Sequence, residues 1–145
     1  MMTQEEAVQA IQAQQRLAAL MRMIGVTVAD IQKTMYKRKA SDCYENYEID
    51  DQAGEITAHF SESRCGCCPN EELYVSFPFS YLWTENFAEI ETEAHAERLR
   101  KAERAAAEKK RREEKAAIEK KEDNDLKTYE RLKKKYEHNE SQSDV

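Results

Sequence analysis

The chain has very few of the residues that interrupt regular structure, with three glycines and two prolines among 145 residues. A loop-rich sandwich or barrel needs turn residues more often, so the composition favours a few long elements. No run of about eighteen apolar residues occurs, which argues against a membrane-spanning helix. The first ten residues do not have the basic and then apolar segments of a signal peptide. We therefore expect a cytoplasmic protein whose four cysteines stay reduced.

Basic residues are almost absent from the middle of the chain. Residues 41–97 contain one basic residue and fourteen acidic residues, whereas residues 1–40 and 98–145 have net charges of +3 and +4. An acidic segment repels the phosphates of nucleic acid and attracts cationic surfaces. The charge pattern therefore favours a basic protein partner for the middle segment.

Residues 1–40 predict a helical hairpin. Thr3 and Glu6 have the spacing of a capping box, in which each side chain accepts a backbone N–H of the other residue. Apolar residues then recur at helical spacing as far as residue 24. Gly25 follows at the position where a glycine commonly ends a helix.

The second helix of the hairpin is expected over residues 28–39, with Thr27 as its N-cap. Two short helices around a glycine turn also have the general shape of a helix-turn-helix DNA reader. We favour the plain hairpin, because Met21 stands where such readers usually have a small residue. Nucleic-acid binding stays the alternative, and its candidate contacts are Lys33, Lys37, Arg38 and Lys39.

Residues 41–83 predict a three-stranded antiparallel meander. Apolar and polar residues alternate on both sides of a turn at residues 50–54, and a third strand follows at residues 73–77. Three strands cannot bury an apolar face alone, so the first helix and the turns after Ser80 are expected to cover it. The predicted register pairs Ile49 with Ile56, Tyr47 with Ala58, and Glu45 with Phe60.

A dense group of large apolar side chains lies where the meander meets the last segment. We expect it to pack in the core and to join the sheet to a long helix. Its members are Phe77, Phe79, Tyr81, Leu82, Trp83 and Phe87.

Residues 84–138 predict a long charged helix with a break near residues 122–125, followed by a disordered tail at residues 139–145. Charge pairs four residues apart, each worth about 0.2–0.5 kcal/mol, and abundant alanine support a helix that packs on nothing. An apolar stripe near its end would either fold back or meet a second copy of the chain. The stripe consists of Leu126, Tyr129, Leu132 and Tyr136. The predicted fold class is thus α+β: an N-terminal helical hairpin, a three-stranded antiparallel meander and a long C-terminal helix.

The cysteines form the sharpest motif in the sequence. A C-x-x-C pair with a further cysteine inside it lies between the second and third strands, and the predicted register brings Cys43 to the same end of the sheet. Four thiols can hold zinc in a tetrahedron. Reduced thiols without a role are the favoured interpretation, zinc is the second, and disulfide or redox chemistry is the third. The candidate ligands are Cys43, Cys65, Cys67 and Cys68.

The sequence contains no catalytic motif. The three histidines are isolated from any nucleophile and acid, and no glycine-rich phosphate loop is present. We therefore expect a protein that is not an enzyme and needs no cofactor, with zinc as the only candidate.

One segment carries a resemblance to a known group of proteins. Phe77-Pro78-Phe79-Ser80-Tyr81-Leu82-Trp83 follows a cysteine-bearing hairpin and precedes an Ala/Glu/Lys/Arg helix that ends in Tyr129-Glu130-Arg131-Leu132-Lys133. Over residues 44–137 this pattern resembles small accessory proteins of tailed-phage and prophage genomes. The resemblance assigns no residue a role. It implies the cytoplasm of an infected bacterium and a host or phage protein as partner, with inhibition of a host defence or regulatory factor as one such role.

Overall fold

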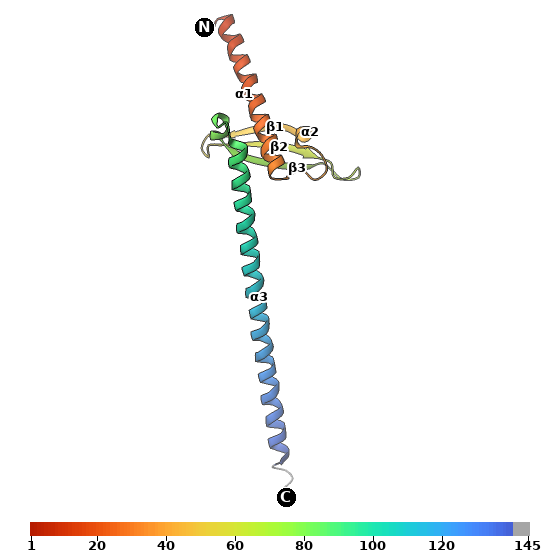
Figure 1. Cartoon of the computed structure of the whole chain (residues 1–145). Helices are drawn as coiled ribbons and strands as arrows, with labels where there is room; N and C mark the ends of the chain where they lie inside the picture. The colour runs from red at the N-terminus through yellow and green to blue at the C-terminus, as the bar shows by residue number, and fades with distance from the viewer. Residues whose placement is uncertain (141–145) are drawn as a thin grey trace. The chain divides into compact units, whose positions relative to one another are not determined.

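The protein is α+β in a computed structural model, which describes residues 1–140, with side chains through residue 137 (Figure 1). The chain divides into two units, Met1–Glu97 and Arg98–Val145, and each is described by itself. The elements are α1 (Gln4–Ile31), α2 (Ala40–Cys43), β1 (Tyr44–Asp50), β2 (Glu55–Glu62), β3 (Glu71–Pro78), the 3-10 helix η1 (Phe79–Trp83) and α3 (Phe87–Glu140).

The sheet is an antiparallel meander in the order β1-β2-β3, which confirms the predicted arrangement. Ile49 faces Ile56 and Tyr47 faces Ala58, as the alternation predicted. The third predicted pair is wrong, because the register shifts at a bulge near the start of β1 and places Tyr44 opposite Phe60. A bulge adds one unpaired residue to a strand, and a pattern of alternation cannot anticipate it.

One continuous helix, α1, occupies Gln4–Ile31, and residues 32–39 form no second helix, so the predicted helical hairpin is wrong. The Thr3–Glu6 capping box is present and α1 begins as expected. The helix then passes through Gly25 without a turn and ends at Ile31. The helix-turn-helix alternative loses its recognition helix, because residues 32–39 form no helix.

Gly25 lies in α1 because the helix approaches the sheet closely there. A methyl group at this position would stand 2.7 Å from Ala58 Cβ and 3.5 Å from Phe77 Cε1. Thr27 does not cap a second helix either, because its Oγ1 donates to Met23 O one turn earlier, at 2.9 Å. Both residues that indicated a turn thus serve a continuous helix packed on strands.

The actual end of α1 is a Schellman motif around a lysine. Lys33 has φ 52, in the left-handed region where glycine is more usual. Thr34 N donates to Ala29 O at 3.0 Å, and Lys33 N donates to Asp30 O at 3.2 Å. These two bonds satisfy carbonyls that the end of the helix would otherwise leave free.

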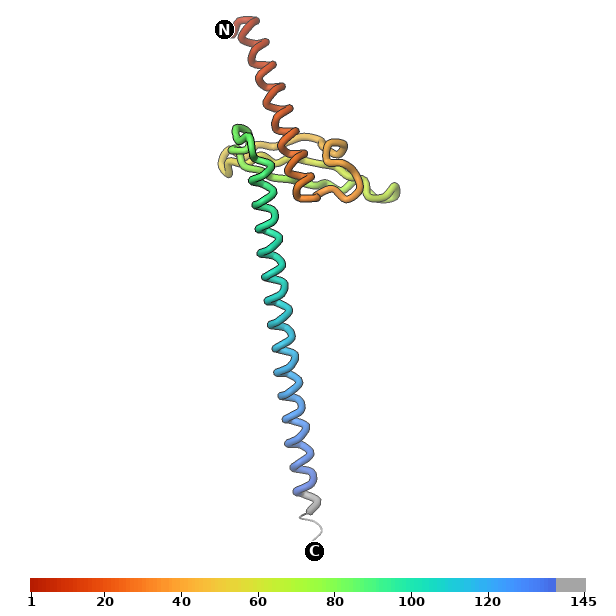
Figure 2. The backbone as a smooth tube through the Cα atoms, in the orientation of Figure 1, coloured from red at the N-terminus to blue at the C-terminus, as the bar shows by residue number. Residues whose placement is uncertain are grey.

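The core lies between the C-terminal half of α1 and one face of the sheet. Figure 2 shows α1 crossing the strands, with its N-terminal half extending beyond them. Inward side chains of β2 and β3 alternate with exposed or half-buried ones, as expected for a sheet with one covered face. The core residues from these elements are Met21, Ile24, Val28, Ala29, Ile56, Ala58, Phe60, Val75 and Phe77.

The predicted aromatic cluster does join the sheet to the start of α3, with one exception. The Tyr81 ring stacks on Phe77 with centroids 6.3 Å apart and contacts Phe87 at 5.6 Å. The Tyr81 hydroxyl donates to buried Glu91 Oε2 at 2.8 Å, and Gln32 Nε2 donates to Glu91 Oε1 at the same distance. Trp83 was expected in the core but is 72% exposed.

The helix α3 is unbroken from Phe87 to Glu140, so the predicted break near residues 122–125 is wrong. Those residues include no glycine or proline, and their low propensity costs less than about 0.7 kcal/mol each. Asp123 accepts from Lys127 Nζ at 2.5 Å, one turn later, which supports the helix at this point. Every side chain described from residue 97 to residue 137 is exposed. The predicted tail begins inside this helix at residues 139–140, and its remainder, residues 141–145, lies outside the described part.

Candidate functional site

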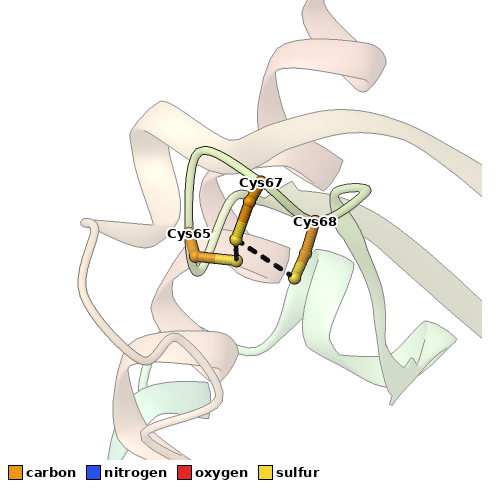
Figure 3. A group of neighbouring side chains, drawn as sticks. All are labelled: Cys65, Cys67 and Cys68. Atoms are coloured by element: carbon orange, nitrogen blue, oxygen red, sulfur yellow. Dashed lines mark hydrogen bonds between the residues drawn. The ribbon is translucent and has the colours of Figure 1, made fainter.

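Three of the four cysteines converge in the loop of residues 63–70 between β2 and β3. Cys67 Sγ lies 3.2 Å from Cys65 Sγ and 3.8 Å from Cys68 Sγ (Figure 3). All three sulfur atoms lie within 4.8 Å of one another. Cys65 is half-buried, and the other two are exposed. The adjacent residues Cys67 and Cys68 point their sulfur atoms to the same place.

The fourth cysteine is not part of this cluster. Cys43 ends α2 and is buried in the core against the sheet. Burial raises the pKa of its thiol, Arg38 opposes this, and the carboxylate of Glu62 adds to the increase. Among the described residues, the group able to share one ion therefore contains Cys65, Cys67 and Cys68.

Contacts within the cluster affect the ionisation of Cys65 and Cys68. Hydrogen bonds from Cys68 and Cys67 lower the pKa of Cys65 to about 7. Contacts with Cys65 and Cys67 raise the pKa of Cys68, because it acts as a donor. Of these two thiols, Cys65 therefore loses its proton more readily.

A buried carboxylate holds the cysteine loop against the segment that follows α1. Glu62, the last residue of β2, has 0% of its surface exposed. Its oxygens accept the backbone N–H groups of Tyr36, Lys37 and Arg38 at 2.8, 2.7 and 2.9 Å. These hydrogen bonds lower the pKa of Glu62 against the opposing effect of burial, and Arg64 lowers it further.

The four basic residues predicted as nucleic-acid contacts are exposed on the loop of residues 32–39, which follows α1, and not on a helix. The ring of Tyr36 has Lys37 Nζ and the Arg64 guanidinium each 5.3 Å from its centroid. Lys37 Nζ also donates to Arg64 O at 3.3 Å, and Arg64 forms an ion pair with Glu71. The two sites predicted separately, the thiols and the basic residues, therefore lie at the same end of the sheet.

The sheet face opposite the core is polar and acidic. Its central row pairs Asn46 with His59 and His59 with Tyr74, and the last two rings meet edge to face at 4.6 Å. Glu48 Oε2 lies 3.8 Å from His59 Nε2. Tyr74 is 59% exposed, and Glu72 is exposed beside it. None of the three strands contains lysine or arginine.

Comparison with protein-family models, curated proteins and solved structures finds no match to this chain. Within the described residues, no helix is both long and apolar enough to span a membrane.

Sequence analysis missed two residues that organise the cysteine end of the sheet. Glu62 continues the inward series Ile56, Ala58 and Phe60, so the period of two already placed it in the core. Its partners are backbone groups 24–26 residues away, which no side-chain pattern reveals. Arg64 is the one basic residue of the acidic segment 41–97, and no motif in the sequence gives it a role.

Proposed function

We propose that this chain is a non-enzymatic interaction protein whose uncovered sheet face binds a cationic surface of a partner protein. The supporting observation is the composition of that face: exposed carboxylates around the exposed ring of Tyr74, with no lysine or arginine in the strands. We call this surface, built on Glu48, His59, Glu72 and Tyr74, the acidic face.

Two properties suit the acidic face to binding. A surface of one charge sign speeds encounters with the opposite sign and rejects nucleic acid. An exposed tyrosine on a rigid strand supplies a large contact area at small entropic cost, and such residues commonly dominate binding energy. The resemblance to phage accessory proteins favours a host or phage protein as the partner, in the cytoplasm of an infected bacterium. Inhibition of a host defence or regulatory factor is the consequence we propose for binding.

The test is capture from nuclease-treated bacterial lysate by the full-length chain, followed by affinity measurement with the purified partner. We compare Glu48→Lys/Glu72→Lys on the acidic face with Glu108→Lys/Glu114→Lys on α3, which changes net charge equally. Binding should weaken at least about tenfold in the first variant, stay unchanged in the second, and fall as salt rises. Equal loss in both variants would mean that net charge, and not this face, decides binding.

The alternative function is nucleic-acid binding by the basic loop. Lys37, Arg38 and Lys39 are exposed on one loop, and Lys37 contacts Arg64; this clustering supports the alternative although no recognition helix is present. Recovery of nucleic acid alone, from lysate without nuclease and with loss at high salt, would favour it over the acidic face. A Lys37→Ala/Arg38→Ala variant would then lose the bound nucleic acid.

A further inference from the structure

The cysteine loop has a geometry that an extended connection does not produce. Side chains of adjacent residues in an extended chain point to opposite sides, yet Cys67 and Cys68 direct their sulfur atoms to within 3.8 Å. Pro69, whose ring fixes its φ, follows this pair directly. Cys65, from the other side of Gly66, completes the set at 3.2 Å from Cys67 (Figure 3).

The sulfur spacing fits a single ion. Zinc binds thiolate at about 2.3 Å, so two sulfur atoms around a tetrahedral ion lie about 3.8 Å apart. The distances from Cys67 Sγ, 3.2 and 3.8 Å, and the limit of 4.8 Å for the whole group bracket this value. Small rotations of the three side chains would equalise them without moving the backbone.

The donor set and its surroundings decide which class of ion fits. Three thiolates, with no carboxylate or imidazole among the described residues of the group, suit thiophilic metals and not magnesium or calcium. Three thiolates around a divalent ion leave one net negative charge. Arg64 precedes the first ligand, and Lys37 Nζ donates to the carbonyl of Arg64 at 3.3 Å; the carboxylates of Glu62 and Glu71 lie beside these two cations. Glu62 holds the base of the loop in place, because its carboxylate accepts three hydrogen bonds from backbone N–H groups of the segment after α1.

We propose that Cys65, Cys67 and Cys68 together bind one thiophilic d10 cation, Zn²⁺ or Cu⁺, through three thiolates of a single loop. Each thiol gives its proton to solvent as its sulfur binds the metal. Zn²⁺ in this site keeps a fourth position open to water or to a donor from another molecule, whereas Cu⁺ is satisfied by three sulfur atoms. The inference is independent of the acidic face and does not require Cys43.

The first experiment titrates the full-length, metal-free protein with Cd²⁺, which takes the same thiolate donors as Zn²⁺, under a non-thiol reductant. Thiolate-to-metal charge-transfer absorption should saturate at one equivalent. Competition with a chromogenic chelator then gives the Zn²⁺ affinity, and a Cu⁺-selective chelator under anaerobic conditions gives that of Cu⁺. The ion for which the protein has the higher affinity is the preferred ion.

Serine variants provide the structural test. Cys65→Ser, Cys67→Ser and Cys68→Ser should each weaken binding at least about tenfold, because each removes one of three ligands. Cys43→Ala and Asn70→Ala should bind as the wild type does, and the second control changes an exposed residue of the same loop and leaves both the core and every thiol intact. Circular dichroism confirms that each variant is folded.

Three results would overturn the site. The first is the absence of charge-transfer absorption with Cd²⁺ together with no competition against either the Zn²⁺ or the Cu⁺ chelator. The second is unchanged affinity in any one of the three serine variants, which would reduce the site to a two-thiol contact. The third is loss of binding in Cys43→Ala while that variant stays folded, which would restore the core cysteine as a ligand.

Discussion

Glu62 shows at the scale of one residue how a charge can be buried when backbone hydrogen bonds, with a smaller effect of Arg64, stabilise it. Its carboxylate accepts three backbone N–H groups from consecutive residues, Tyr36 to Arg38. Hydrogen bonds to the charged form replace the lost hydration, so the carboxylate stays ionised although its side chain is fully buried. The loop from 32 to 39 has no helix of its own, and this carboxylate holds its centre.

Glu62→Gln should destabilise the protein, because one amide oxygen cannot accept three bonds and the NH₂ group meets backbone donors. The folded pKa of Glu62 is lowered, so its ionisation stabilises the fold above its unfolded pKa of about 4.3. That contribution is lost as the pH falls through the folded pKa. The advantage of wild type over the variant should therefore be constant above about pH 5 and shrink toward pH 3.

Urea unfolding at several pH values measures this difference. Glu45→Gln, which changes an exposed carboxylate on β1, is the matched control and should show no such pH-dependent gap. A gap between wild type and Glu62→Gln that widens as the pH falls would contradict the assigned role of the carboxylate.

At the scale of elements, the contact between α1 and the sheet decides the architecture of the first unit. Only the stretch of α1 from Met21 to Ala29 is buried, and Gly25 lies at its middle. The absence of a side chain there lets the helix axis approach the strands at Ala58. The helix costs about 1 kcal/mol in propensity for this glycine, and the closer packing of the surrounding core offsets it.

Gly25→Ala should therefore destabilise the protein even though alanine is the better helix former. An alanine methyl group would lie 2.7 Å from Ala58 Cβ, so the helix or the strand must move, at a cost of about 1–3 kcal/mol. The higher helix propensity of alanine offsets about 1 kcal/mol of this cost. Thermal and denaturant unfolding measure the change. Gly66→Ala, where an added methyl group meets nothing within 4 Å, is the control and should be near neutral. Stabilisation by Gly25→Ala would show that the approach is not tight.

At the scale of the whole molecule, the two units differ in what stabilises them. Met1–Glu97 contains the core, whereas α3 beyond residue 97 has exposed side chains throughout the described part. Its support is local and includes ion pairs such as Arg112–Glu108 and Lys127–Asp123. Exposed pairs of this kind contribute only a few tenths of a kcal/mol each. The apolar stripe from Leu126 to Tyr136 is exposed on α3. Self-association of the chain through this stripe therefore stays a prediction, which light scattering can test.

Amide hydrogen exchange on the intact chain should separate these two regimes. Amides of β2 should exchange only through global unfolding, at least about a hundredfold more slowly than those of residues 100–135, which open locally. Raising the salt concentration to about 1 M should speed exchange in the helix by screening its ion pairs and leave β2 nearly unaffected. Equal protection in both segments at a concentration where the protein is monomeric would contradict local stabilisation of α3.

Local chemistry was enough for several features of this protein. Alternation from Tyr47 to Phe60 and a turn at residues 50–54 determined the meander and two of its register pairs, because a period of two and a short loop act between neighbours. The absence of glycine and proline after Trp83 determined one long helix. The same absence argues against the predicted break near residues 122–125, because the acidic residues there have only a small helical cost.

The tertiary structure alone decided the features that depend on distant partners. Gly25 and Thr27 are compatible with a turn. The helix continues through them instead, because it packs closely on Ala58 and Phe77 of the sheet. Cys43 lies outside the cysteine cluster because its side chain is buried in the core. The local sequence indicates which conformation a residue prefers, and such a preference is worth about 1 kcal/mol. Burial of a helix on a sheet contributes several kcal/mol to stability and therefore overrides it.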